Sequence, residues 1–468
     1  TVSVPGLQIT TVFDALNRPL QILEKGGEGP GFVTRRTIYA YDKAGRLIQQ
    51  TLPNGTRVVN NHDALGRLAH RFLYASGTAV VNVSQQHYLY DAAGNLRQMT
   101  ELTRNQPRSR IVTLTYDASL RLDTETIREA DGTTTVSDYN HDAAGNRTRL
   151  TRTKAAGAPE VTDYAYNALN QLTFFQRTGS PVPAATHCTY DARGNRLTKG
   201  IDVYTWDWAG RLIAVDHESP GAATGMQRYQ YGYDHRDRRV VRIEGETTTL
   251  AMYAGGTSVC EYQYLPSPTP ALIGFPTADW AAPVPHQFSC TKLFVRGSDM
   301  GGGVGGLLYS RDYDQEYWAS LVLHFNPGGS FTVSQSVWQL PDAAASNRFN
   351  HYNGRGDVVA QTDDSGALTW TGSYEAYGTR TRETGTNPDR QRANTKEEDP
   401  TGLLNEGHRY RDLETGTWLS RDPAGFVDGP NLYAYVKQNP WSKFDPEGLS
   451  AEDDTTEPII LHQDDEGN

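Results

Sequence analysis

The 468-residue chain has little of what marks a membrane protein, a disulfide-rich protein or a nucleic-acid-binding protein. It contains no run of 18 apolar residues, so we expect no membrane-spanning helix. Its only cysteines, Cys188, Cys260 and Cys290, lie far apart and form no C-x-x-C pair, which argues against a zinc site or a disulfide framework. The net charge of -11 argues against binding of nucleic acid.

The negative charge is concentrated at the C-terminal end of the chain. Residues 450–468 contain seven Asp or Glu and no Lys or Arg. The chain starts at Thr1 and shows neither the basic nor the apolar region of a signal peptide. We therefore expect a fragment of a longer protein, with an acidic segment over 450–468.

What the chain does have is glycine, tyrosine and one recurring motif. There are 45 Gly and 26 Tyr but only 4 Met, a composition typical of a turn-rich β protein. The motif is an aromatic residue or His, then Asp, two variable residues, Gly, Arg or Asn, and often Leu. Clear copies are YDKAGRL (41–47), HDALGRL (62–68), YDAAGNL (90–96), HDAAGNR (141–147), YDARGNR (190–196) and WDWAGRL (206–212), and degenerate copies start at Phe13, Tyr116, Tyr166 and Tyr233.

Each copy of the motif predicts the tip of a β-hairpin. The aromatic residue suits a half-buried strand, and the Asp carboxylate can accept backbone N–H groups two residues further on. Gly follows three residues later, where such turns need a positive φ. We therefore predict an all-β protein, a long antiparallel sheet of hairpins that coils or closes on itself to hide its edges.

Two segments interrupt this rhythm. Residues 261–290 contain six of the 24 prolines and predict an irregular insertion. The glycine-rich segment 298–306 nominally matches G-x-G-x-x-G, but strand-like residues follow it where a dinucleotide site needs a helix. His62 and His141 replace the aromatic of the motif and have no partner at ligand spacing, so we expect strand residues there, and no metal or cofactor.

The repeats resemble the YD repeats of RHS (rearrangement hot spot) proteins, and the C-terminal part resembles the RHS-repeat-associated core. The core resemblance rests on FNHYNGRGDVVAQTDDSGAL (349–368), GSYEAYGT (372–379) and the block at 399–449 that ends in KFDPEGL. In this family, as in insecticidal toxin complex C components, YD repeats form a hollow shell around a C-terminal toxin. The resemblance implies a repeat shell over 1–346, a core over 347–449 that closes it, and the start of the cargo over 450–468.

The family's core is a self-cleaving aspartic protease, and its pattern D-P-x-G, spacer, D-P-x-G-L matches two segments here. The resemblance makes Asp422 and Asp445 the catalytic pair and Leu449–Ser450 the scissile bond, with Arg421 as an assistant. Two carboxyls about 3 Å apart share one proton, so one can activate water while the other polarises the carbonyl. Such a protease acts once, in cis.

The same residues also suit ordinary turns. Asp399 begins a further D-P-x-G-L sequence and Asp412 begins a related turn, and the family pattern assigns both to hairpins. Only the resemblance separates Asp422 and Asp445 from these two.

The sequence thus favours an exported toxin shell that encloses its own C-terminal cargo, with an N-terminal shell portion or a delivery component as a further partner. One alternative is a shell like that of teneurins, which acts in adhesion or carbohydrate binding at a cell surface without proteolysis. Another is a carbohydrate-active enzyme, which needs two acids about 5–9 Å apart in an open cleft.

Overall fold

The computed structural model describes residues 2–4, 7–26, 33–77, 82–104, 108–154, 157–178, 185–218, 225–254, 256–264, 286–297, 306–313, 319–325, 331–337 and 346–453. Most of the predicted insertion, most of the glycine-rich segment and most of the tail therefore lie outside the described residues. The described ranges contain β-strands and three short 3-10 helices but no α-helix, and none of their helices could cross a bilayer.

The chain divides into two compact units. The first comprises Thr1–Thr37, Ile201–Arg296 and Leu308–Arg348. Its strands are β1 Val2–Val4, β2 Leu7–Phe13, β3 Pro19–Gly26, β18 Asp202–Trp206, β19 Leu212–Glu218, β20 Met226–Tyr233, β21 Arg239–Glu244, β22 Thr247–Ala254, β23 Thr257–Tyr264, β24 His286–Arg296, β26 Ala319–Phe325 and β27 Phe331–Val337. Strands β4 Val33–Tyr41, β25 Leu307–Asp312 and β28 Asn347–Tyr352 contain residues of both units.

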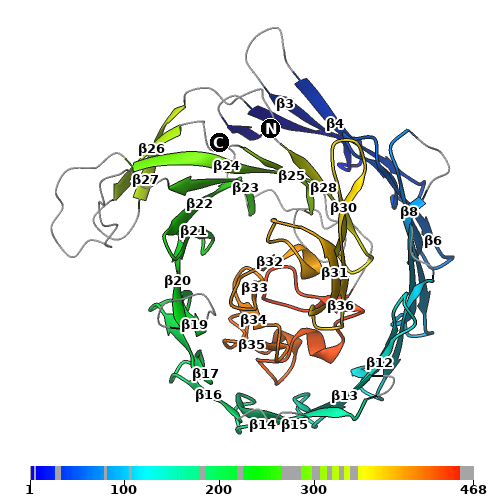
Figure 1. Ribbon diagram of the computed structural model, residues 1–468, viewed down its shortest axis with the longest axis vertical. Coiled ribbons are helices and arrows are strands. Elements are labelled where there is room, and N and C mark those ends of the chain that lie inside the picture. Colours follow the sequence, from blue (N-terminus) through cyan, green and yellow to red (C-terminus); the bar gives the residue numbers. More distant parts are fainter. Residues whose placement is uncertain are drawn as a thin grey trace. The chain divides into compact units, whose positions relative to one another are not determined.

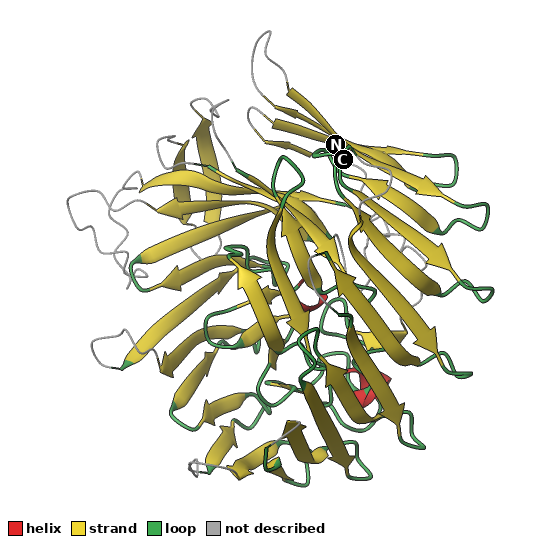
Figure 2. Cartoon of the chain, turned by 45° about the vertical axis from the view of Figure 1, so that its right-hand side comes forward, coloured by secondary structure: helices red, strands yellow, loops and turns green. Residues whose placement is uncertain are grey.

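The second unit comprises Ile38–Gly200, Gly297–Leu307 and Phe349–Asn468. Its repeat strands are β5 Leu47–Thr51, β6 Arg57–His62, β7 Leu68–Tyr74, β8 Asn82–Tyr90, β9 Leu96–Thr103, β10 Arg110–Tyr116, β11 Leu122–Arg128, β12 Thr134–His141, β13 Arg147–Lys154, β14 Glu160–Tyr166, β15 Leu172–Thr178, β16 Thr186–Tyr190 and β17 Arg196–Lys199. Successive strands of this series pair antiparallel (Figures 1 and 2).

The same unit contains the C-terminal segment, which is made of shorter elements. These are β29 Val358–Thr362, β30 Leu368–Tyr374, β31 Arg380–Gly385, η1 Ala393–Thr395, β32 Glu397–Glu398, β33 Leu403–Asn405, β34 Tyr410–Asp412, β35 Thr417–Trp418, η2 Phe426–Asp428, η3 Val436–Gln438, β36 Lys443–Phe444 and β37 Glu452–Asp453. The predicted all-β class and its antiparallel hairpins are confirmed; the closing of the sheet into a shell stays a prediction.

One buried cluster joins the repeat strands to the C-terminal segment within the second unit. From the repeats it takes side chains such as Leu114 and Leu122, and from the C-terminal segment Trp418, Tyr435 and Trp441. Each of these five side chains is at most 3% exposed. One face of the repeat strands is therefore buried against the C-terminal segment, which explains their alternation of buried and half-buried residues.

Every motif copy named above forms a hairpin tip with the same register. The aromatic or His residue pairs with the residue six positions further on, after a register shift at its own position, as in Tyr41 with Leu47 and Tyr90 with Leu96. At Asp42, Oδ1 accepts the N–H of Ala44 and of Arg46, both at 2.9 Å, and Oδ2 accepts Arg46 Nε at 2.7 Å. The Arg46 side chain and these backbone donors lower the pKa of the Asp42 carboxyl.

In five copies of the motif a tyrosine links the tip to the preceding one. Its hydroxyl donates to the carbonyl oxygen of the residue that resumes the strand after the previous turn, at 2.8 Å from Tyr90 to Leu68 and 2.7 Å from Tyr116 to Leu96. The same bond is repeated by Tyr166, Tyr190 and Tyr233. The motif therefore fixes both its own turn and the spacing to its neighbour.

The fourth turn residue needs a positive φ, and this suits glycine. Gly45 and Gly66 have φ values of 88° and 86° at this position. In the copy that starts at Tyr116 the position is taken by Leu120, with a φ of 60° and a side chain that is 47% exposed. A left-handed conformation costs a non-glycine residue about 1–2 kcal/mol.

We therefore expect Leu120→Gly to increase the free energy of unfolding by about 1 kcal/mol, measured by denaturant titration. A matched control is Leu65→Gly, one position earlier in its own turn, where φ is not positive. The free energy of unfolding of Leu65→Gly should not increase. An unchanged or lower stability of Leu120→Gly would contradict the assignment of strain to this position.

Candidate active site

The C-terminal segment that carries the predicted site docks on one type of repeat. In these copies the turn ends in Asn or Gln, whereas the other turns end in Arg. Several hydrogen bonds join the C-terminal segment to these turns. The donors and acceptors of five of them are Asn431 Nδ2 to Asn146 Oδ1 at 2.6 Å, Gln438 Nε2 to Gly145 O at 2.9 Å, Gln171 Nε2 to the Tyr433 hydroxyl at 2.9 Å, the Tyr433 hydroxyl to Gly194 O at 2.8 Å and Asn439 Nδ2 to Asn95 Oδ1 at 2.9 Å.

The residue type at the end of the turn explains this choice. An Arg at this position, such as Arg46 or Arg67, reaches back along its own turn Asp, and Arg67 also lies over the ring of Tyr90 in the next copy. The shorter Asn146 bonds the same Asp position, Asp142, and keeps its amide oxygen for the C-terminal segment. An asparagine at the end of the turn therefore offers an amide oxygen to the C-terminal segment, whereas the longer arginine side chain would occupy this position.

Asn146→Arg should loosen the C-terminal segment, because it removes the shorter of two hydrogen bonds that the Asn431 amide donates, while the bond to Ala144 O at 3.1 Å stays. The loss of one such bond costs about 0.5–1.5 kcal/mol. We expect faster cutting within residues 431–439 in limited proteolysis.

The control for this experiment is Arg46→Asn, the reverse exchange in a turn with no such contact. It should leave the proteolysis pattern as in the unmodified chain. Equal protection of residues 431–439 in both variants would show that the Asn-ending turns do not hold the segment.

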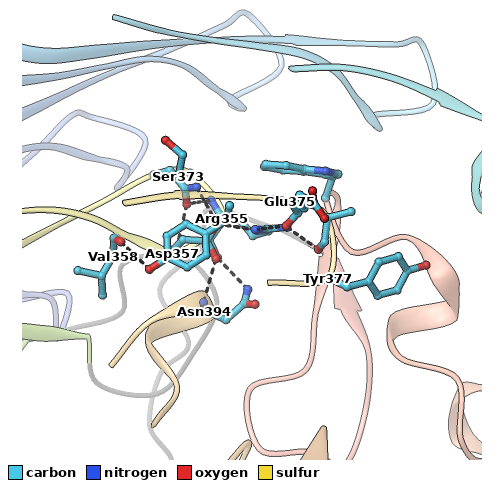
Figure 3. A network of polar contacts seen from close by, with 12 residues as sticks. Arg355, Asp357, Val358, Ser373, Glu375, Tyr377 and Asn394 are labelled. Atoms are coloured by element: carbon cyan, nitrogen blue, oxygen red, sulfur yellow. Dashed lines mark hydrogen bonds and ion pairs between the residues drawn. The ribbon is translucent and has the colours of Figure 1, made fainter. Parts of the chain in front are cut away.

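A buried arginine ties the hairpins of the C-terminal segment to one another. Arg355 donates through Nε to Asp357 at 2.8 Å, through Nη1 to Ala376 O at 2.6 Å and through Nη2 to Glu375 O at 3.0 Å. Asp357 accepts the backbone N–H of Asn394 at 3.0 Å on its other oxygen (Figure 3). Every donor of this guanidinium therefore serves to fix the backbone around it.

Trp441 connects the Arg355 network to a repeat strand. The Arg355 guanidinium lies 4.0 Å from the centroid of the Trp441 ring, and the indole N–H of Trp441 donates to Glu125 on β11 at 2.7 Å. Burial, with the nearby Glu375, raises the pKa of the Glu125 carboxyl. Since Asp445 follows Trp441 by four residues, this anchor fixes where the second predicted aspartate begins its turn.

The structure brings Asp422 and Asp445 together around Arg409. Nη2 of Arg409 lies 2.9 Å from Oδ2 of Asp422 and 2.9 Å from Oδ2 of Asp445. The two carboxylates thus meet at one guanidinium nitrogen. Arg409 itself is held over the Trp418 ring, 3.9 Å from its centroid.

The predicted scissile peptide is wrapped around Asp445. Oδ1 of Asp445 accepts the N–H of Leu449 at 2.8 Å and the N–H of Ser450 at 3.2 Å. Nε of Arg409 donates to Gly448 O at 2.5 Å. Asp445 therefore contacts the nitrogen of the Leu449–Ser450 bond directly, and Arg409 contacts Gly448, the residue before Leu449.

Both carboxylates are removed from water. Asp422 is 8% and Asp445 2% exposed. Burial raises the pKa of Asp422, although the Arg409 guanidinium opposes the change, and burial lowers the pKa of Arg409. Such a buried pair is unlike the open cleft that a carbohydrate-active enzyme needs, which disfavours that alternative.

Arg421 does not occupy the place expected of an assistant. It is exposed while Asp422 beside it is buried, so the two side chains point to different sides. A Cβ atom on Gly194 would lie 2.8 Å from Nε of Arg421, which places the arginine against the repeat turn at 190–196. The structure thus corrects this part of the expectation: the arginine at the two carboxylates is Arg409.

Asp399 and Asp412 form turns, as the sequence indicates. The N–H of Gly402 donates to Asp399 O at 2.9 Å, and the N–H of Gly416 donates to Asp412 O at 2.8 Å. Asp412 also forms a buried ion pair with Arg196 at 3.0 Å. Burial alone would raise the pKa of Asp412, but Lys199 and Arg196 lower it.

Sequence reasoning missed Arg409. It lies in the block at 399–449, but it precedes Asp422 by 13 residues and Asp445 by 36, and no spacing rule connects it to either. A buried arginine between two acids could have been inferred only from the need to neutralise them.

Comparisons with known proteins agree with this architecture. The family model described as Teneurin YD-shell matches residues 58–254. A tRNA3(Ser)-specific nuclease WapA of Bacillus spizizenii is 27% identical over 298 residues, which are 63% of this chain and 10% of that protein. The probable deoxyribonuclease RhsA of Dickeya dadantii is 30% identical over 211 residues, which are 44% of this chain and 13% of that protein.

Solved structures with the same fold are those of the TcdB2-TccC3 toxin proteins. The TcdB2-TccC3-TEV structure covers 94% of this chain with a TM-score of 0.68 and 19% identity, and the match covers 20% of that chain. The structure of TcdB2-TccC3 without its hypervariable C-terminal region matches with a TM-score of 0.67 and 20% identity, over 94% of this chain and 20% of that chain. The chain thus spans about a tenth of the length of the curated relatives and a fifth of the solved chains.

The fold, the repeated turns and these matches together define a YD-repeat protein. The chain is an RHS/YD-repeat protein, as the sequence indicates.

Proposed function

We propose that this chain is part of a toxin shell that separates from its C-terminal cargo by cutting itself once, between Leu449 and Ser450. The observation that carries the proposal is the arrangement around Arg409. Two buried carboxylates meet at this arginine, and one of them contacts the nitrogen of the peptide bond to be cut.

The reaction would be hydrolysis of one amide bond. Water adds to the carbonyl carbon of Leu449, the bond to the nitrogen of Ser450 breaks, and that nitrogen leaves with a proton. The raised pKa of Asp422 makes it the carboxyl that supplies a proton, whereas Asp445, which accepts hydrogen bonds on both oxygens, takes the proton of the water. Arg409 stabilises the negative charge that remains.

Attachment supplies the substrate. Asp445 lies four residues before the bond, in the turn that wraps this peptide, so the peptide is present at a high effective concentration without a binding step. The same geometry limits the chain to one turnover, because the new C-terminus at Leu449 remains beside the carboxylates.

The cut would not by itself free the downstream segment. The N–H of Ala451 donates to Asp428 at 2.7 Å, and β37 pairs with β36, so residues on both sides of the bond stay joined by hydrogen bonds. Cleavage therefore has to be detected under denaturing conditions.

The relatives support a toxin as the cargo. The similar proteins of Bacillus spizizenii and Dickeya dadantii are named as nucleases, and one similar toxin structure is described as lacking a hypervariable C-terminal region. In this proposal the nuclease or other toxin follows Ser450, the shell itself binds no nucleic acid, and the protein is exported for delivery. Its partners are the cargo and an N-terminal shell portion or delivery component.

Asp422→Asn and Asp445→Asn should each keep the chain whole. Each removes a carboxylate that the hydrolysis requires, so denaturing mass spectrometry should show 51.8 kDa for the variants. The unmodified chain should give a species that ends at Leu449 and a peptide of residues 450–468.

Asp399→Asn is the matched control, since it changes the first residue of the other D-P-x-G-L sequence. It should be cut like the unmodified chain. Cleavage that persists in both Asp422→Asn and Asp445→Asn would refute the site, and an unmodified chain that stays uncut at acidic and neutral pH would favour the teneurin-like shell, to which the matching family model belongs by name.

A further inference from the structure

Two histidines are in contact across neighbouring repeat strands. Neither side chain belongs to the buried cluster described above. His70 on β7 and His87 on β8 are direct cross-strand partners. Their Nδ1 atoms are 2.9 Å apart and their rings are nearly perpendicular, at 85°. Both rings are partly exposed, whereas the flanking Leu73 and Tyr88 are buried. The pair has no part in the proposed cleavage.

The geometry of the two rings fits a common third atom. If the rings faced each other along a straight hydrogen bond, their centroids would be about 5 Å apart. The observed centroid distance is 4.4 Å, so each ring is turned away from the line between the two nitrogens. An ion can bind both Nδ1 atoms when the two rings turn to the same side of that line, because their lone pairs then meet at one point.

The distance between the nitrogens indicates the kind of ion. A metal about 2.0–2.1 Å from both nitrogens holds them about 2.9 Å apart when its bonds meet at 90°, and about 3.4 Å apart in a tetrahedral site. The observed 2.9 Å is an ordinary hydrogen-bond distance between the two rings, and it also equals the value for a right angle. This favours a tetragonal ion with imidazole ligands, Cu²⁺ or Ni²⁺, over tetrahedral Zn²⁺.

The surroundings leave room for the remaining ligands. His70 and His87 line a cavity of about 500 Å³, together with side chains that include Asp63, Arg67 and Thr100. No group of three His, Cys, Asp or Glu able to hold a metal occurs among the residues that the structure describes. The protein would thus provide two ligands, and water or a bound molecule would complete the coordination.

We propose that His70 and His87 form a two-histidine site for Cu²⁺ or Ni²⁺ that clamps β7 to β8. Copper should bind the more tightly of the two ions, as it does at most nitrogen sites. Because the ion bridges two strands of the folded sheet, its binding should also raise the melting temperature.

The test is a Cu²⁺ titration of the full chain at pH 7.5, monitored by calorimetry, with glycine present as a weak competitor for the ion. His70→Gln and His87→Gln should each weaken the site at least tenfold. His187→Gln is the matched control, because His187 is an exposed strand histidine whose cross-strand partner is Phe174, and it should bind as the unmodified chain does.

Electron paramagnetic resonance of the unmodified chain with one equivalent of Cu²⁺ gives a readout that needs no variant. The proposal predicts coupling to two equatorial imidazole nitrogens, reduced to one in His87→Gln. Equal copper affinity in His70→Gln and the unmodified chain, or coupling to a single imidazole in the unmodified chain, would overturn the proposal.

Discussion

The structure depends on one side-chain oxygen in each repeat turn, from Asp or in one copy from Asn167, which closes the turn by accepting its backbone donors. At Asp42 two backbone N–H groups and the Arg46 side chain converge on this carboxylate. Because the bulge and the register follow from this turn, the aromatic residue before it reaches the carbonyl of the preceding repeat. Repetition of this one bond pattern builds the sheet, and the described residues contain no α-helix.

The variable last residue of the turn adds a second function to the same unit. Where it is Arg, as at Arg46 and Arg67, this side chain binds the Asp of its own turn, and Arg67 also lies over Tyr90 of the next copy. Where it is Asn, as at Asn95 and Asn146, a polar group remains free for the C-terminal segment. The C-terminal segment in turn uses Arg355 and Trp441 to place Asp445, so the position of the candidate site follows from the repeats.

The repeats could be predicted from the sequence because the interactions that define them are local. The aromatic–Asp–Gly pattern lies within seven residues, and even the copy with Leu120 in place of Gly forms the same hairpin. The pairing of Asp422 with Asp445 came from the resemblance to a family, and the structure brings both residues to Arg409. Arg409 itself, and the placement of Arg421 against the turn at 190–196, depend on contacts between distant segments that no local pattern encodes.

The contact between the two histidines could not be predicted from a local sequence pattern either. His70 and His87 are 17 residues apart, and only the register of β7 with β8 sets them opposite each other. A shift of one residue would separate the rings onto opposite faces of the sheet. The repeat pattern draws attention to other histidines, those that replace the aromatic residue of the motif. These are His62 and His141, and both lie at the ends of their strands.

The central claim is that Arg409 joins the two carboxylates and aligns the peptide at Leu449. The most direct measurement is the rate at which residues 450–468 appear as a free peptide in Arg409→Lys and in Arg421→Lys. Lysine keeps the charge but cannot bond two carboxylates and Gly448 at once, so Arg409→Lys should slow the release at least tenfold. Arg421→Lys should match the unmodified chain. Normal release from Arg409→Lys, or a loss confined to Arg421→Lys, would contradict the account.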